Sequence, residues 1–465
     1  MIGMPAAGRL CCRRQKFIVG TDRIDTAALN CHDRLSCSLG SVNPRYARQR
    51  SSRSQTMPNV LLISANVGSL FDENPIIRTQ WKSQISQAVI SQKAKFVAIH
   101  FQETGGKEFK KYSKDVAVVI TELSHLLGDF TCMRAFLDLN YDNIEEYTAL
   151  GTVIYIHQDW ISKVEQYRFD VNSFEHITEG TLIEENLSES IHVRKEKFAK
   201  DFWPAIRWGR KGFLHTRWRI NSRIIDLINI HLFHDESNLE LTQNPLLYSQ
   251  NRKRALDYTV AQYNAWQSSH SEGESSCLFI YGDFNFRLRT DSFLEKITKD
   301  QEVHEIEDHK PSTDTVLTKI NNSMHHTPLK RNLSAIEFRH KELKSKTDVI
   351  DQNIVLRIEK KLFDYCKPNV FVSQWQQYRE CDTEPNYFDF KELSIKFPPT
   401  YPWSEDPTHA NSYMKTRAPA WCDRVLMNEE AHDLVIGSND PIYDVIGMQA
   451  CMGDHKPVML SFTLT

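Results

Sequence analysis

Short apolar runs alternate along the chain with longer stretches in which apolar residues recur at a helical spacing. The helical spacing occurs at residues 81–91, 250–266 and 355–365. The short runs predict buried strands, at residues 60–65, 96–101, 151–156, 212–220, 224–232, 277–281, 424–427 and 457–464. Because strands dominate and helices fall between them, the pattern predicts a layered, mixed α/β domain.

Two stretches lack this periodicity. Residues 1–57 are rich in Arg and Ser, and we expect a disordered basic leader there, or sequence upstream of a start at Met57. A mitochondrial transit peptide is the less favoured interpretation, because the leader contains three Asp and has no amphipathic stripe. Residues 300–350 are polar and charged, and they predict a long surface insertion within a domain that spans residues 58–465.

The composition is that of a soluble globular protein, with 40% hydrophobic and 25% charged residues. No apolar run approaches the roughly 18 residues of a membrane span. The leader holds ten Lys and Arg against three Asp, a net charge of +7, so the remaining residues carry −10 of the total of −3. An acidic body that handles an anionic substrate needs positive charge focused in one cleft or supplied by a metal.

The ten cysteines are scattered, and none forms a C-x-x-C pair. This spacing argues against a zinc site. Unpaired thiols in a chain of 465 residues favour a reducing compartment.

Polar residues follow or precede many of the predicted strands. They are Asn66, Gln102, Glu103, Asn229, His231, Asp283, Asn285, Asp423 and Asp454. In mixed sheets, the carboxyl end of one strand and the amino end of an antiparallel neighbour share an edge. We therefore expect these side chains to converge on one rim.

Carboxylates with an amide oxygen at one rim suit Mg²⁺, which prefers oxygen ligands. Histidines beside such a site are placed to bind a phosphoryl oxygen or carry a proton. Each residue also has an ordinary interpretation, since Asn66 and Asn285 are typical turn residues and His231 is typical of a satisfied core histidine. Taken together, they favour metal-assisted hydrolysis of a phosphate ester by water.

Six motifs resemble the ordered motifs of the inositol polyphosphate 5-phosphatases, a family of the DNase I-like endonuclease/exonuclease/phosphatase superfamily. The motifs are Ser-Ala-Asn66-Val-Gly, Gln102-Glu103, Asn229-Ile-His231-Leu, Gly282-Asp283-Phe-Asn285-Phe-Arg287, Pro419-Ala-Trp-Cys-Asp423-Arg424 and Gly453-Asp454-His455-Lys456-Pro457-Val. Further stretches are similar to the type I branch, at residues 65–72, 211–213, 216–218, 229–235, 360–365, 397–402 and 451–457. The resemblance implies a four-layer α/β/β/α sandwich of two mixed, mostly antiparallel sheets packed face to face.

The resemblance also implies roles for individual residues. Glu103 and Asn66 would hold Mg²⁺, with Asp454 as a further ligand. Asp283 would orient and help deprotonate the attacking water, while Asn285 positions the phosphoryl group. The other catalytic residues are His455, oriented by Asp423 and donating to a phosphate oxygen, His231, which stabilises the same group, and Asn229 of the same motif.

For substrate binding, the resemblance implies that Lys415, Arg417 and Tyr401 hold the adjacent 4-phosphate, with Lys211 and Arg424 as further cations. The implied activity is removal of the 5-phosphate from soluble inositol 1,4,5-trisphosphate, and from inositol 1,3,4,5-tetrakisphosphate, which ends calcium signalling. One alternative is a lipid 5-phosphatase, but Pro402 stands where many lipid-active members have a basic residue.

A nuclease of the same superfamily is a second alternative, although it calls for a broad basic face that a body of net charge −10 does not favour. A catalytically silent binding module is the third. We expect a cytoplasmic monomer with a small-molecule substrate and no nucleic-acid partner. Type I members are expected to end in a prenylation box, and because no Cys lies near Thr465, attachment at the inner face of the plasma membrane is left open.

Overall fold

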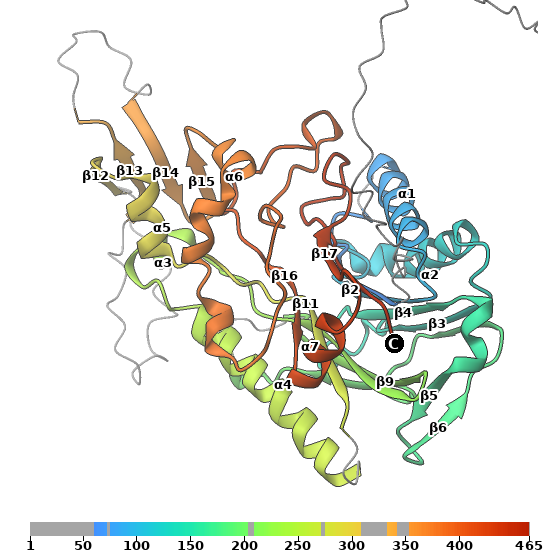
Figure 1. Ribbon diagram of the computed structural model, residues 1–465. Helices are drawn as coiled ribbons and strands as arrows, with labels where there is room; N and C mark the ends of the chain where they lie inside the picture. Colours follow the sequence, from blue (N-terminus) through green and yellow to red (C-terminus); the bar gives the residue numbers. More distant parts are fainter. Residues whose placement is uncertain are drawn as a thin grey trace, which may run out of the picture. The chain divides into compact units, whose positions relative to one another are not determined.

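The computed structural model describes residues 60–71, 75–202, 209–270, 275–307, 333–341 and 353–464 (Figure 1). These residues all belong to the unit that runs from Gln55 to Thr465. The expected leader, the start at Met57 and most of the expected insertion lie outside the described residues. The domain boundary near residue 58 therefore stays a prediction.

The first sheet has seven strands, in the order β17-β18-β1-β2-β4-β3-β7. Its strands are β1 (Val60–Asn66), β2 (Phe96–Gln102), β3 (Cys132–Leu137), β4 (Gly151–Ile156), β7 (Gly180–Glu184), β17 (Ile442–Val445) and β18 (Val458–Phe462). The pairs β1/β2 and β3/β7 are parallel and the other pairs are antiparallel. The parallel β1/β2 pair brings two carboxyl ends to the same edge of this sheet.

The second sheet has the order β16-β11-β10-β9-β5-β6, and β8 also pairs with β9. Its strands are β5 (Val164–Arg168), β6 (Ser173–His176), β8 (Arg194–Lys197), β9 (Gly212–Ile220), β10 (Arg223–His231), β11 (Cys277–Asp283) and β16 (Asp423–Met427). Only β10 and β11 pair in parallel among these strands. All eight strands predicted from the sequence are confirmed in these two sheets.

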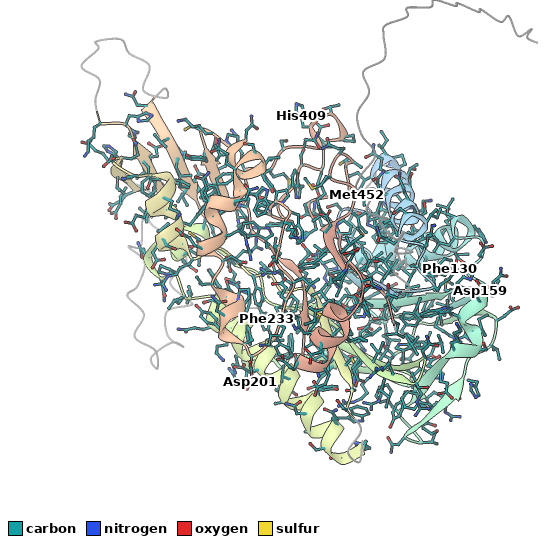
Figure 2. All side chains as sticks on the ribbon, in the orientation of Figure 1. Phe130, Asp159, Asp201, Phe233, His409 and Met452 are labelled. Carbon is teal, nitrogen blue, oxygen red and sulfur yellow. The ribbon has the colours of Figure 1, made fainter. Side chains whose placement is uncertain are left out.

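Three hydrophobic clusters separate four layers. Alternate residues of β1 point to opposite faces, so Val60 and Leu62 enter the core between the two sheets, whereas Leu61 and Ile63 pack under α1 (Pro75–Ser91) and α2 (Phe109–Leu126). The third cluster lies between the outer face of the second sheet and α4 (Ser249–His270), and Figure 2 labels one of its members, Phe233. The α/β/β/α arrangement and the helices predicted at 81–91 and 250–266 are confirmed.

A further antiparallel sheet, which the sequence did not predict, joins β12 (Glu302–Glu307), β13 (Leu333–Arg339), β14 (Ile354–Glu359) and β15 (Leu362–Tyr365). The helix expected at residues 355–365 is therefore wrong. A two-residue turn joins β14 to β15, since Glu359 pairs with Leu362. Within the insertion predicted at residues 300–350, the described residues form β12 and β13 of this sheet.

The remaining helical segments are short connections. They are α3 (Asn238–Gln243), α5 (Thr290–Ile297), α6 (Val370–Ser373), α7 (Glu429–Ile436), η1 (Gln158–Lys163), η2 (Lys200–Phe202), η4 (Trp375–Cys381), η5 (Glu384–Tyr387) and η6 (Pro407–His409). None of the helices that the structure describes combines the length and the apolar character needed to cross a membrane.

The core between the two sheets becomes polar toward one rim. Asn229 donates from Nδ2 to the carbonyl oxygens of Phe101 (3.1 Å) and Gly151 (2.8 Å), and its Oδ1 accepts from Gln102 (2.8 Å). His100 stacks on Tyr281 with ring centroids 3.6 Å apart. Burial lowers the pKa of His100 to about 3, so this imidazole is neutral. These contacts fix the spacing of the two sheets where the functional side chains emerge.

Candidate active site

Strand register places the polar strand ends beside one another. Asn66 lies opposite Gln102 at the carboxyl ends of β1 and β2. In the second sheet, His231, Asp283 and Asp423 occupy paired positions on three adjacent strands. Because the two sheets pack face to face, both sets lie at the same rim.

A pocket opens at this rim, and eight residues singled out from the sequence line it. They are Asn66, Glu103, Asp283, Asn285, Tyr401, Arg417, Asp454 and His455. Three more lining residues, His234, Asp235 and Arg287, were quoted within motifs but received no role. The signal that could have found Arg287 is its place two residues after Asn285, within reach of the same turn.

The turn after β11 holds Asp283 from several sides. Gly282 is needed here, because a Cβ at this position would lie 2.0 Å from the carbonyl oxygen of Ile230. The backbone N–H of Asn285 donates to Asp283 Oδ1 (2.8 Å), and Asn66 Nδ2 donates to Asp283 Oδ2 (3.0 Å). Asn285 adopts the left-handed conformation that Asn tolerates, with φ of 51°. The geometry aims this carboxylate into the pocket.

The amide of Asn285 is fully engaged within the protein. Its Nδ2 donates to the carbonyl oxygen of Leu232 (3.0 Å) and to Asp283 Oδ2 (3.2 Å), while its Oδ1 accepts from Arg287 (2.7 Å). The expected direct contact with a phosphoryl group is therefore replaced by support of Asp283. The physical reason is that both amide hydrogens already have acceptors.

Positive charge keeps Asp283 ionised. Burial alone would raise the pKa of this carboxyl, but His455, His231 and Lys211 outweigh burial and hold the pKa well below its usual range. A buried carboxylate in this state is an acceptor without a proton of its own.

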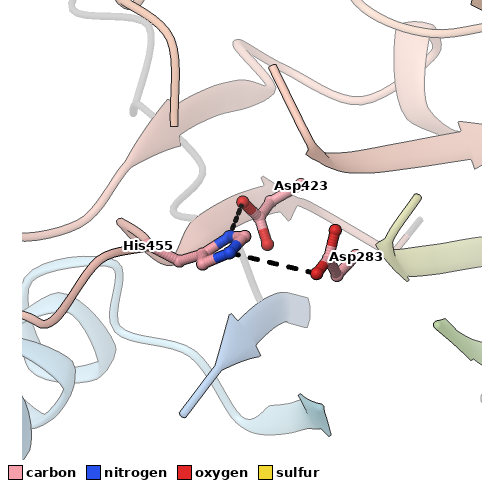
Figure 3. A group of neighbouring side chains, drawn as sticks. All are labelled: Asp283, Asp423 and His455. Atoms are coloured by element: carbon pink, nitrogen blue, oxygen red, sulfur yellow. Dashed lines mark hydrogen bonds and ion pairs between the residues drawn. The ribbon is translucent and has the colours of Figure 1, made fainter. Parts of the chain in front are cut away.

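His455 lies between two carboxylates (Figure 3). Its Nδ1 bonds to Asp423 Oδ2 at 2.8 Å, and its Nε2 lies 4.0 Å from Asp283 Oδ2. Thr400 Oγ1 also donates to Asp423 Oδ2 (2.7 Å), which fixes that carboxylate. Burial disfavours the charged imidazole, but Asp423 and Asp283 outweigh it and raise the pKa of His455 to about 10.

The ligand atoms of Asp283, Asp423 and His455 are close enough together to surround a metal ion. The two carboxylates raise the pKa of His455 and so favour its protonated form, which can donate a hydrogen bond from Nε2 into the pocket.

A separate corner of the pocket carries oxygen ligands. A Cβ added to Gly68 would lie 3.0 Å from Glu103 Oε2 and 3.3 Å from Asn66 Oδ1, so both oxygens face one small cradle. Asp454 lines the same pocket, and its Oδ1 accepts from Ser69 Oγ (2.8 Å). This donor set of carboxylate and amide oxygens fits a hard divalent cation.

Glu103 sits in a strained and strongly positive setting. Its φ is 58°, which is uncommon for a residue other than glycine and is frequent at functional sites. Burial opposes ionisation, but Lys211, His231 and Arg210 together lower the pKa of Glu103 to about 2. The Glu103 carboxylate is therefore ionised near neutral pH and can bind a cation.

Lys211 and His231 lie behind the carboxylates, outside the set of pocket-lining residues. Lys211 Nζ contacts His231 Nε2, and the same Nε2 is 3.3 Å from Asp283 Oδ2. Burial lowers the pKa of Lys211 to about 8. The predicted contacts of Lys211 with substrate and of His231 with the phosphoryl group are corrected, since both side chains are buried against Asp283 and Glu103.

Three further predicted residues also serve the scaffold. Arg424 is 1% exposed and donates to Glu392 (2.8 Å) and Asp382 (2.8 Å), so it cannot reach a ligand. Lys415 is exposed and forms an ion pair with Asp364 at 2.9 Å instead of lining the pocket. Asn229 joins the two sheets, as described above, and has no amide group left for chemistry.

Side chains of both signs line the pocket. Arg287, Arg417 and His455 are cationic, whereas Glu103, Asp283 and Asp454 carry carboxylates. Such a lining suits an anionic ligand that binds together with a cation.

Comparison with known proteins places these features in context. The family described as Endonuclease/Exonuclease/phosphatase family 2 matches residues 353–461. A probable type I inositol 1,4,5-trisphosphate 5-phosphatase of Caenorhabditis elegans is 45% identical over 418 residues, which cover 88% of this chain and 100% of the relative. Inositol polyphosphate-5-phosphatase A of Homo sapiens is 36% identical over 415 residues, covering 87% of this chain and 93% of the relative.

Among solved structures, the chain is similar to the inositol polyphosphate 5-phosphatase domain of SPsynaptojanin in complex with inositol (1,4)-bisphosphate and a calcium ion. The TM-score is 0.42 at 14% identity, with 88% of this chain and 84% of that chain covered.

Proposed function

The chain belongs to the type I inositol 1,4,5-trisphosphate 5-phosphatases, and we propose that it removes the 5-phosphate from soluble inositol 1,4,5-trisphosphate. Inositol 1,3,4,5-tetrakisphosphate is the second proposed substrate. The reaction is hydrolysis of a phosphate monoester by water, and its consequence is the end of a calcium signal.

The observation that carries this proposal is the pairing of an ionised acceptor with a protonated donor in one pocket. Asp283 Oδ2 and His455 Nε2 are 4.0 Å apart, and their pKa values are displaced in opposite directions. Asp283 accepts a hydrogen bond from the attacking water, which orients it and helps to deprotonate it, while His455 donates to a phosphoryl oxygen. Phosphoryl transfer depends chiefly on such positioning and charge stabilisation, so it needs no covalent nucleophile.

Glu103 and Asn66, with Asp454 beside them, are the residues that would hold Mg²⁺. When bound, a divalent cation supplies Lewis-acid polarisation of the phosphoryl group and offsets charge on the leaving oxygen. Glu103 contributes to this role because its carboxylate is ionised before any cation binds.

The phosphates that do not react need separate donors. Arg417 and Tyr401 line the pocket next to His455, and the rings of Tyr401 and His455 lie 4.6 Å apart. Arg417 donates two of its five N–H groups to the main-chain oxygens of Thr416 and Asp235, so three N–H groups remain to bind an anion. We assign the adjacent 4-phosphate to these two residues.

The proposed setting is the cytoplasm, where the protein acts as a monomer on a soluble substrate. The six cysteines among the described residues are all free thiols, which supports a reducing compartment.

The direct test is phosphate release from a panel of soluble and lipid inositol phosphates, with and without Mg²⁺. We expect turnover of the soluble 1,4,5-trisphosphate that depends on Mg²⁺ and is lost in Asp283→Asn. Turnover of the lipid substrates alone, or of DNA or RNA with none of the inositol phosphates, would overturn the proposal.

A further inference from the structure

We propose that Arg287, held from behind by a buried ion-pair network of Arg252, Asp235 and Glu384, positions the catalytic groups on both sides of the pocket. The inference rests on the proposed function for its rate measurements. Arg287 is assigned the role of a positioning residue, which acts through Asn285 and Tyr401 rather than on the substrate.

The first contact sets the orientation of the Asn285 amide. Arg287 Nη2 donates to Asn285 Oδ1 at 2.7 Å, and this turns the amide nitrogen toward Asp283 (3.2 Å). If the guanidinium is removed, the amide is free to rotate and present its oxygen to the Asp283 carboxylate. Asp283 then loses a donor and gains a repulsive neighbour.

The second contact supports the opposite wall. The Arg287 guanidinium lies over the ring of Tyr401, 4.5 Å from its centroid, and Tyr401 in turn packs against His455. Within the described part of the chain, the buried Nε and Nη1 of Arg287 have no hydrogen-bond partner, so the contact of the guanidinium with the ring is a cation–π contact. Arg287 therefore connects the Asp283 turn to the His455 side of the pocket.

The network behind Arg287 is itself buried. Glu384 accepts from the backbone N–H of Arg287 (3.0 Å) and from Arg252 Nε (2.8 Å) and Nη2 (2.6 Å). Arg252 also pairs with Asp235, whose carboxylate lies 3.9 Å from Arg287 Nε. The four side chains are at most 8% exposed.

This network joins three separate segments of the chain. Arg252 belongs to α4 and Glu384 to η5, whereas Asp235 follows β10. Two guanidinium groups face two carboxylates, so the charges balance. Buried ion pairs add little net stability compared with apolar packing, but they restrict geometry strongly. The arrangement is thus better suited to holding the turn in place than to stabilising the fold.

The test is a double-mutant cycle of Arg287→Met and Asn285→Ala, with kcat and KM measured on inositol 1,4,5-trisphosphate. We expect Arg287→Met to lower kcat by roughly 10²-fold, because misplacement of reacting groups carries a cost of that order, with KM almost unchanged. In the Asn285→Ala background the same substitution should lower kcat by only about tenfold, because the contact through Asn285 is already lost and only the support of Tyr401 remains to be removed.

Two results would overturn the proposal. A rise in KM with kcat unchanged would make Arg287 a direct ligand of the substrate. Fully multiplicative losses in the double variant would show that Arg287 does not act through Asn285.

Gentler variants keep the test open if Arg287→Met does not fold. Glu384→Gln keeps the shape of the side chain outside the pocket and should lower kcat by roughly tenfold at constant KM. Arg289→Met is the matched control, because Arg289 is exposed and, among the described residues, its guanidinium pairs with nearby Asp291, and it should leave kcat and KM unchanged. Equal effects of Glu384→Gln and Arg289→Met would contradict the positioning role.

A readout without turnover separates this inference from the proposed function. The same cycle, measured as midpoints of urea unfolding, should show coupling between Arg287 and Asn285 even if the wild-type protein releases no phosphate. Absence of phosphate release by the wild type would refute the proposed function alone, whereas independent unfolding effects would refute the contact.

Discussion

His192 and His455 each lie between two carboxylates, near opposite edges of the second sheet. His192 bonds to Glu184 through Nδ1 (2.7 Å) and to Glu175 through Nε2 (3.0 Å). His455 bonds to Asp423 through Nδ1 (2.8 Å), but its Nε2 stays 4.0 Å from Asp283. The first imidazole uses both nitrogens within the protein, whereas the second keeps one for the pocket.

The difference shows that two neighbouring carboxylates do not by themselves make a histidine catalytic. His192 joins β7 of the first sheet, through Glu184, to β6 of the second sheet, through Glu175. It therefore acts as a clamp between sheet edges. His455 has the same kind of neighbours but a donor left over, and that remaining N–H is what chemistry requires.

The largest expected effect tests this distinction directly. His455→Ala should lower kcat by roughly 10²-fold or more, because a charge-stabilising donor is lost. His192→Gln should leave kcat within about twofold, as for a substitution distant from the site. Steady-state phosphate release measures both, and a similar loss in the two variants would remove the basis of the comparison.

A second test concerns the proposed cation site of Glu103, Asn66 and Asp454. Gly68→Ala puts a methyl group 3.0 Å from Glu103 Oε2 and should raise the Mg²⁺ concentration for half-maximal activity by roughly 10- to 100-fold. Gly128→Ala is the control for backbone strain without a contact, because its φ of 42° disfavours alanine but a Cβ there meets no atom within 4 Å, so the Mg²⁺ affinity should not change. Calorimetric titration with Mg²⁺ checks the affinity independently of turnover, and an unchanged affinity in Gly68→Ala would move the metal elsewhere.

The same distinction extends to two basic residues close together in the chain. Arg417 lines the pocket with donors to spare, so Arg417→Ala should raise KM by roughly tenfold, the value of about one charged hydrogen bond. Lys415 forms an ion pair with Asp364 at the surface, so Lys415→Ala should change KM by less than about threefold. The reverse order of the two KM values would restore Lys415 to the substrate site.

The smallest effect concerns stability and its dependence on pH. Burial lowers the pKa of His192, but Glu184 and Glu175 outweigh burial and raise it above the ordinary value. The stabilisation by the charged clamp is therefore complete below the unfolded-state pKa and is lost as pH rises through the higher folded-state value.

His192→Gln should accordingly reduce the free energy of unfolding at pH 6 by no more than about 1 kcal/mol, since the partners are partly exposed, and by less at pH 9. Urea unfolding at both values measures this. A larger loss at pH 9 than at pH 6 would mean that the imidazole is neutral in the folded protein.

The sequence was most informative where local pattern and local chemistry coincide. Short apolar runs identified eight strands, and polar residues at their ends indicated Asn66, Glu103 and Asp283 as one site. It failed at residues 355–365, because a short apolar run has no decisive period and the two-residue turn between Glu359 and Leu362 was not recognised.

By itself, then, the sequence determined the strands, the layered class of fold and the residue types that gather at the rim, since these depend on periodicity and turn chemistry within a few residues. Only the tertiary structure decided which charges are free to act. Arg424 and Lys415 have the same local signals as Arg417, but their partners Glu392 and Asp364 lie 32 and 51 residues away along the chain. Whether a charged side chain can bind a ligand depends on whether such a distant partner already pairs with it, and only folding brings the two into contact.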